Sequence, residues 1–349
     1  QGAYKIDKSK SAVELKNTKA FPENVEFEAL LTFSGEAKGN LIRSVSPDPN
    51  NVTVIQHHSF IKLPDSKYKP RKFDPRSGAI SISYMDYSTP IDEPITKKYI
   101  IRHRLEKKNP ELEISEAVEP IIYYLDPGTP EPVKSALLDG GKWWNQAYES
   151  IGFKDAFQVK MLPEDADPLD CRYNVIQWVH RSTRGWSYGA SVVDPRTGEI
   201  IKGHVSLGSL RIRQDYMIAQ ALTKDPFSTD NRKNNMLELA IARIRQLSAH
   251  EIGHTIGFAH NFAASSNNRA SVMDYPHPLV NVVNGEIVFD DAYDTGIGEW
   301  DKVTVAYSYS DFRSDQNEND ELNKILENAT NDGLRSVSYT HLTLPTIGC

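Results

Sequence analysis

The eleven residues from His250 to His260 read HEIGHTIGFAH, and they constrain this chain more than any other stretch. His250 and His254 are four residues apart, so on a helix they project from one face about a turn apart. Gly257 can adopt the positive φ that lets a chain leave a helix sharply, and that turn would bring His260 round to the same point. We therefore predict a metal site with His250, His254 and His260 as ligands.

Three histidines are a typical ligand set of a catalytic zinc ion, whose fourth position holds water. Glu251 lies beside them, near enough to take a proton from that water without binding the metal itself. Five fixed residue types at this spacing occur by chance in roughly one chain of this length in ten thousand or fewer. Asp274 is the single acid between Glu251 and Glu286, so an aspartate-ligand site is the alternative.

The segment before the motif indicates a helix that starts near Asn234, with an asparagine cap and apolar residues at helical spacing. Upstream, we predict strands at 119–126, 156–162 and 173–180, a helix within 130–152 and another at 210–222. Residues 189–194 and 199–209 flank PRTG and read as a hairpin, and we place 199–209 at the edge of the sheet. This order favours an α+β catalytic domain over residues 116–335.

Residues 1–115 read as a β-rich domain, because short runs of β-branched and aromatic residues alternate with Asp/Pro and Gly turn signals. His57 and His58 fall within one of these strands. Neighbouring strand residues face opposite sides, so we expect these two histidines to be structural rather than ligands of one metal.

Composition excludes several classes of function. The net charge of −7 and the lack of a dense basic patch argue against a nucleic-acid partner. No stretch approaches the roughly 18 apolar residues of a membrane-spanning helix. Two cysteines, Cys171 and Cys349, are too few for a disulfide framework.

Both ends indicate a fragment. Gln1 is preceded by no signal segment, so we expect the signal to lie outside this sequence. The stretch VSYTHLTLPT, Val337–Thr346, matches one reading frame of a common sequencing-library adapter, and we interpret residues 336–349 as a non-native tail.

The sequence SVMDYP supplies Ser271, Met273 and Tyr275, with Met273 thirteen residues beyond His260. Together with H-E-x-x-H-x-x-G-x-x-H, this Ser-x-Met-x-Tyr turn resembles the metzincin clan of zinc metalloproteases, which combine that motif with a Met-turn. The resemblance implies a twisted mixed sheet, a backing helix, an active-site helix and a Met-turn. It also implies that Met273 forms an apolar floor under zinc and that Tyr275 is a fifth ligand or a donor to the transition state.

A wider resemblance, over most of residues 100–310, is to large and mostly uncharacterised bacterial zinc metalloproteases. It implies an extracytoplasmic enzyme (periplasmic, outer-membrane associated or secreted) that acts on a protein or peptide substrate, and a substrate-binding edge strand favours endopeptidase action. In metzincins an edge strand pairs with the extended substrate, and here that role would fall to residues 199–209, with His204 on the strand. Asn261 departs from the residue that follows the third histidine in the best-known metzincin families.

Some alternatives stay open. A catalytically inactive, zinc-stabilised binding module would keep the ligands without the hydrolysis, although such relatives usually lose the glutamate or a histidine. The β-rich half could bind a partner by itself. Exopeptidase action is not excluded, the pocket wall is expected within residues 262–300, and a calcium ion near the acidic stretch FDDAYD has no further support.

Overall fold

The computed structural model describes residues 2–181, 186–223, 227, 232–313 and 315–338. These residues divide into two units, which are treated separately below. One unit consists of residues 1–64 with 167–172, and the other of residues 65–166 with 173–349. The composition-based division into 1–115 and 116–335 stays a prediction. Of the expected non-native tail, residues 336–349, the part from residue 339 onwards lies outside the described residues.

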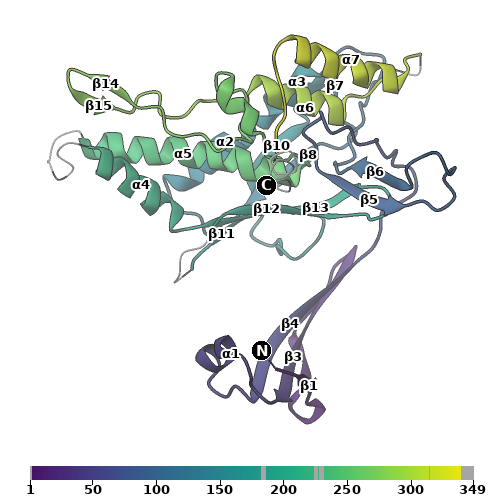
Figure 1. The fold of residues 1–349 in the computed structure, drawn as a ribbon, viewed down its shortest axis with the longest axis vertical. Helices are drawn as coiled ribbons and strands as arrows, with labels where there is room; N and C mark the ends of the chain where they lie inside the picture. The colour runs from purple at the N-terminus through teal and green to yellow at the C-terminus, as the bar shows by residue number, and fades with distance from the viewer. Residues whose placement is uncertain (1, 182–185, 224–226, 228–231, 314, 339–349) are drawn as a thin grey trace. The chain divides into compact units, whose positions relative to one another are not determined.

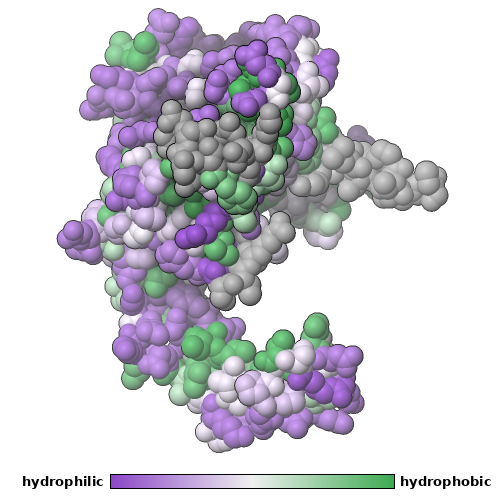
Figure 2. Space-filling model, turned by 90° about the vertical axis from the view of Figure 1, so that its left-hand side faces the viewer, coloured by the Kyte–Doolittle hydropathy of each residue, from purple (hydrophilic) through white to green (hydrophobic). Residues whose placement is uncertain are grey.

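The first unit is built on a four-stranded antiparallel sheet in which β3 pairs with β1, β2 and β4. Its elements are β1 (Tyr4–Ile6), η1 (Lys8–Lys10), β2 (Ala12–Ala20), β3 (Asn24–Gly35), α1 (Asn40–Val45) and β4 (Asn51–Ile61). Large apolar side chains such as Leu15 and Phe60 remain exposed, and Figure 2 shows hydrophobic residues gathered on this unit. His57 contacts Glu26 while His58 stacks on Phe27, so the two histidines have separate surroundings, as expected.

The second unit contains a five-stranded mixed sheet in the order β10-β8-β11-β13-β12 (Figure 1). Its first four strands are parallel, and β12 runs antiparallel to β13. The sheet strands are β8 (Ile121–Leu125), β10 (Phe157–Met161), β11 (Asn174–Val179), β12 (Tyr188–Val193) and β13 (Ile200–Gly208). Short pairs surround it: β5 (Ser81–Met85) with β6 (Thr96–Ile100), β7 (Ser115–Glu116) with β9 (Phe153–Lys154), and β14 (Asn281–Val283) with β15 (Glu286–Val288).

The helices of this unit are α2 (Val133–Lys142), α3 (Trp144–Ser150), α4 (Arg211–Leu222), α5 (Arg232–Thr255), η2 (Phe262–Ser266), α6 (Glu299–Tyr309) and α7 (Glu318–Asn331). Helix α5 contains His250, Glu251 and His254, and α2 packs against it. The main core includes Tyr123, Trp144, Ile176 and Ile252 and lies between the sheet and the helices. The expected α+β class, with a mixed sheet, a backing helix and an active-site helix, is confirmed.

Two details of the sequence-based fold need revision. The helix expected within 130–152 is divided into α2 and α3 at Trp143. Gly140 lies where α2 crosses α5: a Cβ there would stand 1.9 Å from the carbonyl oxygen of Arg245.

The prediction that residues 199–209 form the sheet edge is wrong. The expected hairpin is present, but β13 pairs with β11 on its other side, so β12 and not β13 is the edge strand at this side of the sheet. His204 therefore lies on an internal strand. A hydrophobic pattern shows which residues are buried, but not which strand is the last in the sheet.

Candidate metal centre

The C-terminal end of α5 delivers the first two histidines and then reverses the chain. Gly257 has φ of 104°, and the amide of Phe258 donates to the carbonyl of Gly253, which closes the end of the helix. A side chain at position 257 would also collide, since its Cβ would lie 2.1 Å from the carbonyl oxygen of Ile101. The turn carries the chain back so that His260 faces His250 and His254.

The three Nε2 atoms converge on one point. Nε2 of His260 lies 3.1 Å from that of His254 and 3.2 Å from that of His250. Three nitrogens held tetrahedrally around a zinc ion at about 2.0–2.1 Å are about 3.3 Å apart. The spacing therefore fits a single zinc ion, and among the described residues this is the group of three His, Cys, Asp or Glu side chains whose ligand atoms come together.

Backbone carbonyls fix the protonation of two of these rings. Nδ1 of His250 donates to the carbonyl of Val272, and Nδ1 of His254 donates to that of Phe258, each at 2.8 Å. With the proton on Nδ1, Nε2 presents a lone pair. Such a lone pair is what an imidazole ligand offers to a metal, so the donor chemistry of His250 and His254 also fits a zinc ion.

Burial keeps the three imidazoles neutral. It lowers the pKa of His250 well below its usual value, lowers the pKa of His254 and brings that of His260 to about 4. Neutral imidazole is the form that binds metal.

Glu251 is buried beside the triad, with 6% of its surface exposed. Burial raises the pKa of this carboxyl to about 7, against the opposing effect of the nearby Arg243 and Arg211 and of a hydrogen bond from the backbone of Gly189. Gly189 belongs to β12 and packs tightly on α5: a Cβ there would stand 2.1 Å from the carbonyl oxygen of Glu251. The edge strand and the glutamate are therefore direct neighbours.

The Met-turn lies beneath the histidines. Met273 is 1% exposed, and a Cβ at Gly253 would stand 2.2 Å from its sulfur, so the thioether fits only because that helix position is glycine. The ring of Tyr275 is half exposed, with its centre 4.5 Å from that of His260 and 5.3 Å from that of His250. Each of the predicted site residues therefore lies at this one place.

The other candidates from the sequence lie elsewhere. The carboxylate of Asp274 accepts from the hydroxyl of Ser265 and the amide of Tyr275 and is outside the converging triad. His277 is exposed. The acidic side chains at 290, 291 and 294 are also exposed, and the described residues bring no group of three ligands together there.

Residues far away in the sequence support this centre and were not foreseen. The carboxylate of Asp301 on α6 accepts from the hydroxyl of Ser271 at 2.6 Å and from the amide of Val272 at 2.8 Å, which fixes the Met-turn. Tyr123 and Tyr309 donate their hydroxyls to the carbonyls of Thr255 and Ile256 at the end of α5. Because 29 or more residues separate each pair, no local spacing in the sequence indicates them.

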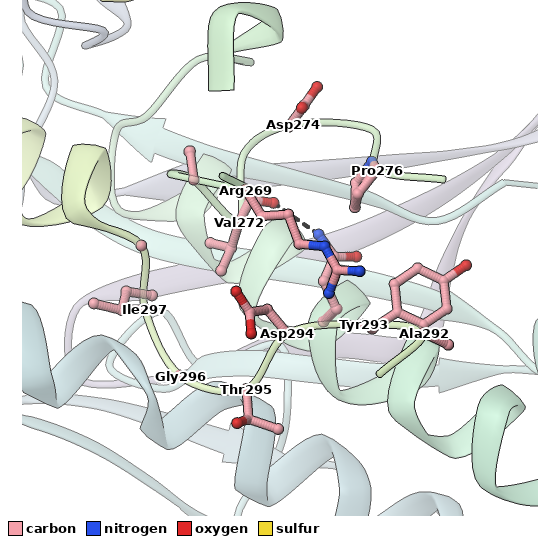
Figure 3. Close-up of a pocket in the computed structure, with 13 residues that line it drawn as sticks. Arg269, Val272, Asp274, Pro276, Ala292, Tyr293, Asp294, Thr295, Gly296 and Ile297 are labelled. Atoms are coloured by element: carbon pink, nitrogen blue, oxygen red, sulfur yellow. Dashed lines mark hydrogen bonds between the residues drawn. The ribbon is translucent and has the colours of Figure 1, made fainter. Parts of the chain in front are cut away.

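A cavity of about 50 Å³ lies beside the Met-turn segment (Figure 3). Val272 and Arg269 line it from the Met-turn side, and Tyr293, Asp294 and Ile297 from the segment before α6. A further lining residue, Gln246, donates its amide to the Val272 carbonyl at 2.9 Å, so this carbonyl joins the cavity wall to His250. The side-chain oxygen of Gln246 is buried without a partner among the described residues, and it leaves a hydrogen-bond acceptor in the wall.

Comparison with known families agrees with this geometry. Residues 232–339 match a family described as Met-zincin. The C-terminal part of the chain is a Met-zincin domain. The match begins with α5 and spans the three histidines, the Met-turn, α6 and α7. It supports a metzincin-type zinc metalloprotease.

The Met-zincin domain is preceded by a second match. Residues 1–108 match a family described as a domain of unknown function (DUF5117). A search of curated proteins finds no match to this chain. Among the described residues, no helix has both the length and the apolar character needed to cross a membrane.

Proposed function

We propose that this chain is a zinc-dependent endopeptidase whose metal ligands are His250, His254 and His260. The observation that carries the proposal is the convergence of the Nε2 atoms of three neutral imidazoles beside a buried carboxyl. A zinc ion held there would supply a bound water of lowered pKa and a positive charge that polarises the scissile carbonyl.

Glu251 is the proposed general base. It accepts a proton as water attacks the peptide carbon and then passes that proton to the leaving amine. Tyr275 donates its hydroxyl to the oxyanion that develops on the carbonyl oxygen. Its exposed ring lies beside His260 and His250, on the substrate side of the triad.

The substrate is proposed to bind as an extended peptide against β12. This strand is the edge strand on the side of the sheet next to α5, and Gly189 on it contacts Glu251. Backbone hydrogen bonds to an edge strand hold a peptide without regard to its sequence. We further propose that the cavity beside the Met-turn receives a substrate side chain.

The Glu251→Gln variant tests the mechanism. We expect it to keep one zinc per chain, because Glu251 is not a ligand, and to lose nearly all hydrolysis, because the amide cannot accept the proton. Glu238→Gln on the exposed side of the same helix is the matched control and should retain activity. Full hydrolysis by Glu251→Gln would refute the assigned base.

The competing reading is an inactive, zinc-stabilised binding module. It predicts zinc in the unaltered protein without cleavage of any unfolded protein or peptide. The presence of Glu251 and of all three histidines favours the enzyme.

We also propose that the enzyme acts outside the cytoplasm of a bacterium, as its wider resemblance implies. Fractionation of the native source with antibodies to this domain tests the location. Recovery with the cytoplasmic fraction would contradict it.

A further inference from the structure

An arginine on the metal-binding face of α5 has no partner for its charge. Arg243 is 8% exposed, and its Nη1 atom is buried without a hydrogen-bond partner among the described residues. Burial lowers the pKa of this guanidinium. A buried charge is normally paired, because a desolvated ion without a partner strongly destabilises the folded state. The fold therefore holds a cationic group for which the described residues supply no counter-charge of its own.

Asp215 on α4 is a candidate partner, but it is already engaged. Its carboxylate accepts from Nε of Arg211 at 3.0 Å and lies 2.9 Å from Nη2 of the same side chain, a two-point contact with one cation. Arg211 and Arg243 both oppose the rise in pKa that burial causes at Asp215 and at Glu251, so both guanidinium groups are within electrostatic range of both carboxyls. Asp215 balances Arg211, and Glu251 carries a proton in the proposed reaction, which leaves one positive charge in excess.

Helical spacing connects Arg243 to the metal centre. Arg243 lies on the same stripe of α5 as His250 and His254, because positions seven and eleven residues apart differ by only about 20° around a helix. Gln246 lies between them and lines the cavity beside the Met-turn (Figure 3). The ring of Tyr293, another lining residue, has its centre 5.7 Å from the guanidinium carbon of Arg243. The stripe therefore leads from the metal, past the cavity wall, to Arg243.

We propose that Arg243 binds a carboxylate of the substrate close to the scissile bond. The inference rests on the proposed function, because it takes a peptide to be bound at the metal. Arg243 precedes His250 by two helical turns, about 10 Å along the axis, a distance that roughly three residues of an extended peptide span.

A carboxylate is the group that this position lacks. It accepts two parallel hydrogen bonds from the planar guanidinium and supplies the missing negative charge. Because Arg243 is already desolvated by the fold, the substrate meets a cation that water does not compete for. The carboxylate can come from an acidic side chain near the scissile bond or from the C-terminus of the substrate.

Substitutions of Arg243 separate recognition from folding. In Arg243→Met an apolar side chain fills similar space, and replacing an unpaired buried charge in this way leaves stability unchanged or raises it. Arg243→Lys keeps the charge and loses the two-point geometry. Arg213→Met, at an exposed position on α4, is the matched control.

The test uses the full zinc-loaded chain and matched fluorogenic peptides, built on a sequence that the unaltered protein cleaves in unfolded casein. One set has an amidated C-terminus and carries Glu or Gln in turn at each position near the scissile bond, on both sides. A second set is cut short after that bond and ends in either a free carboxylate or an amide. Measuring kcat/KM for each pair isolates the effect of the carboxylate.

We expect the unaltered protein to prefer the carboxylate member of at least one pair by about 10- to 100-fold, the range of a hydrogen bond to a charged group. A preference for Glu over Gln identifies an acidic side chain as the source, and a preference for the free C-terminus identifies the terminal carboxylate. Arg243→Met should lose the preference while cleaving the uncharged member at the unaltered rate. Arg243→Lys should keep part of the preference and Arg213→Met all of it.

Hydrolysis without any carboxylate preference, or a preference that survives in Arg243→Met, would overturn this inference and leave the proposed function intact. An equal loss on charged and uncharged peptides would overturn it too, because Arg243 would then serve the fold and not the carboxylate. Should Arg243→Met not fold, Arg243→Lys decides, and an undiminished preference in that variant counts against the inference. Failure of the unaltered protein to cleave casein or any peptide refutes the proposed function and the inference with it.

Discussion

At the scale of single residues, the protonation of three imidazoles decides what the site can do. The carbonyls of Val272 and Phe258 keep a proton on Nδ1 of His250 and His254, so each Nε2 lone pair points inwards. Burial also keeps all three rings neutral, and neutral imidazole is the form that binds metal. The site is therefore built for a metal rather than for proton transfer between histidines.

Removing one imidazole tests this interpretation. We expect His254→Ala to lose stoichiometric zinc, because two ligands cannot hold the ion in competition with a chelator. His277→Ala is the control: this histidine is exposed, and the variant should retain one zinc per chain. Metal analysis after dialysis measures both, and a full zinc complement in His254→Ala would disprove the ligand set.

At the scale of elements, α5 positions the ligands, and the Met-turn and α6 hold α5 from below. Asp301 on α6 is fully buried and accepts from Ser271, Val272 and Gly298. Burial raises the pKa of this carboxyl from 3.8 to about 7, although the three donors act in the opposite direction. Its charge state therefore links the stability of the Met-turn to pH.

The sign of this linkage follows from the raised pKa. Between about pH 4 and pH 7 the folded protein holds the Asp301 proton more tightly than the unfolded chain does. The contribution of Asp301 to the free energy of unfolding therefore falls as pH rises through this window, by up to about 1.4 kcal/mol per pH unit, and is constant above it. Asp301→Asn should lack this dependence, since its amide does not titrate.

Chemical denaturation of both proteins at several pH values measures the difference. We expect the stability of the unaltered protein relative to Asp301→Asn to decrease from pH 4 to pH 7. Parallel pH profiles would contradict a raised pKa at Asp301.

Contacts within one element, or within a hairpin, could be predicted from the sequence. Helix α5, its two histidines and the turn at Gly257 follow from local spacing, as does the β12–β13 hairpin. The free edge of the sheet could not be predicted correctly, because pairing of β13 with β11 depends on residues about thirty positions away. The support from Asp301 was missed for the same reason, since it joins segments that only tertiary packing brings together.

At the scale of the whole molecule, metal binding should stabilise only the unit that contains the triad. A ligand that binds the folded state at about a thousand times its Kd adds about 4 kcal/mol to the free energy of unfolding. For a domain of this size that corresponds to roughly 10 °C in melting temperature.

Calorimetry with and without a chelator tests this expectation. We predict that the transition of the unit formed by residues 65–166 and 173–349 moves down, while that of the unit formed by residues 1–64 and 167–172 stays in place. A chelator that shifts the melting temperatures of both units equally, or that shifts neither, would contradict a single metal site in the catalytic unit.

The most direct test of the central claim measures zinc per chain together with cleavage of unfolded casein, with and without a chelator. The unaltered protein and Glu251→Gln are compared side by side. The account predicts one zinc in both proteins, and chelator-sensitive cleavage in the unaltered protein alone. A protein without zinc would contradict the metal centre, and zinc in both proteins without any cleavage would contradict the enzyme.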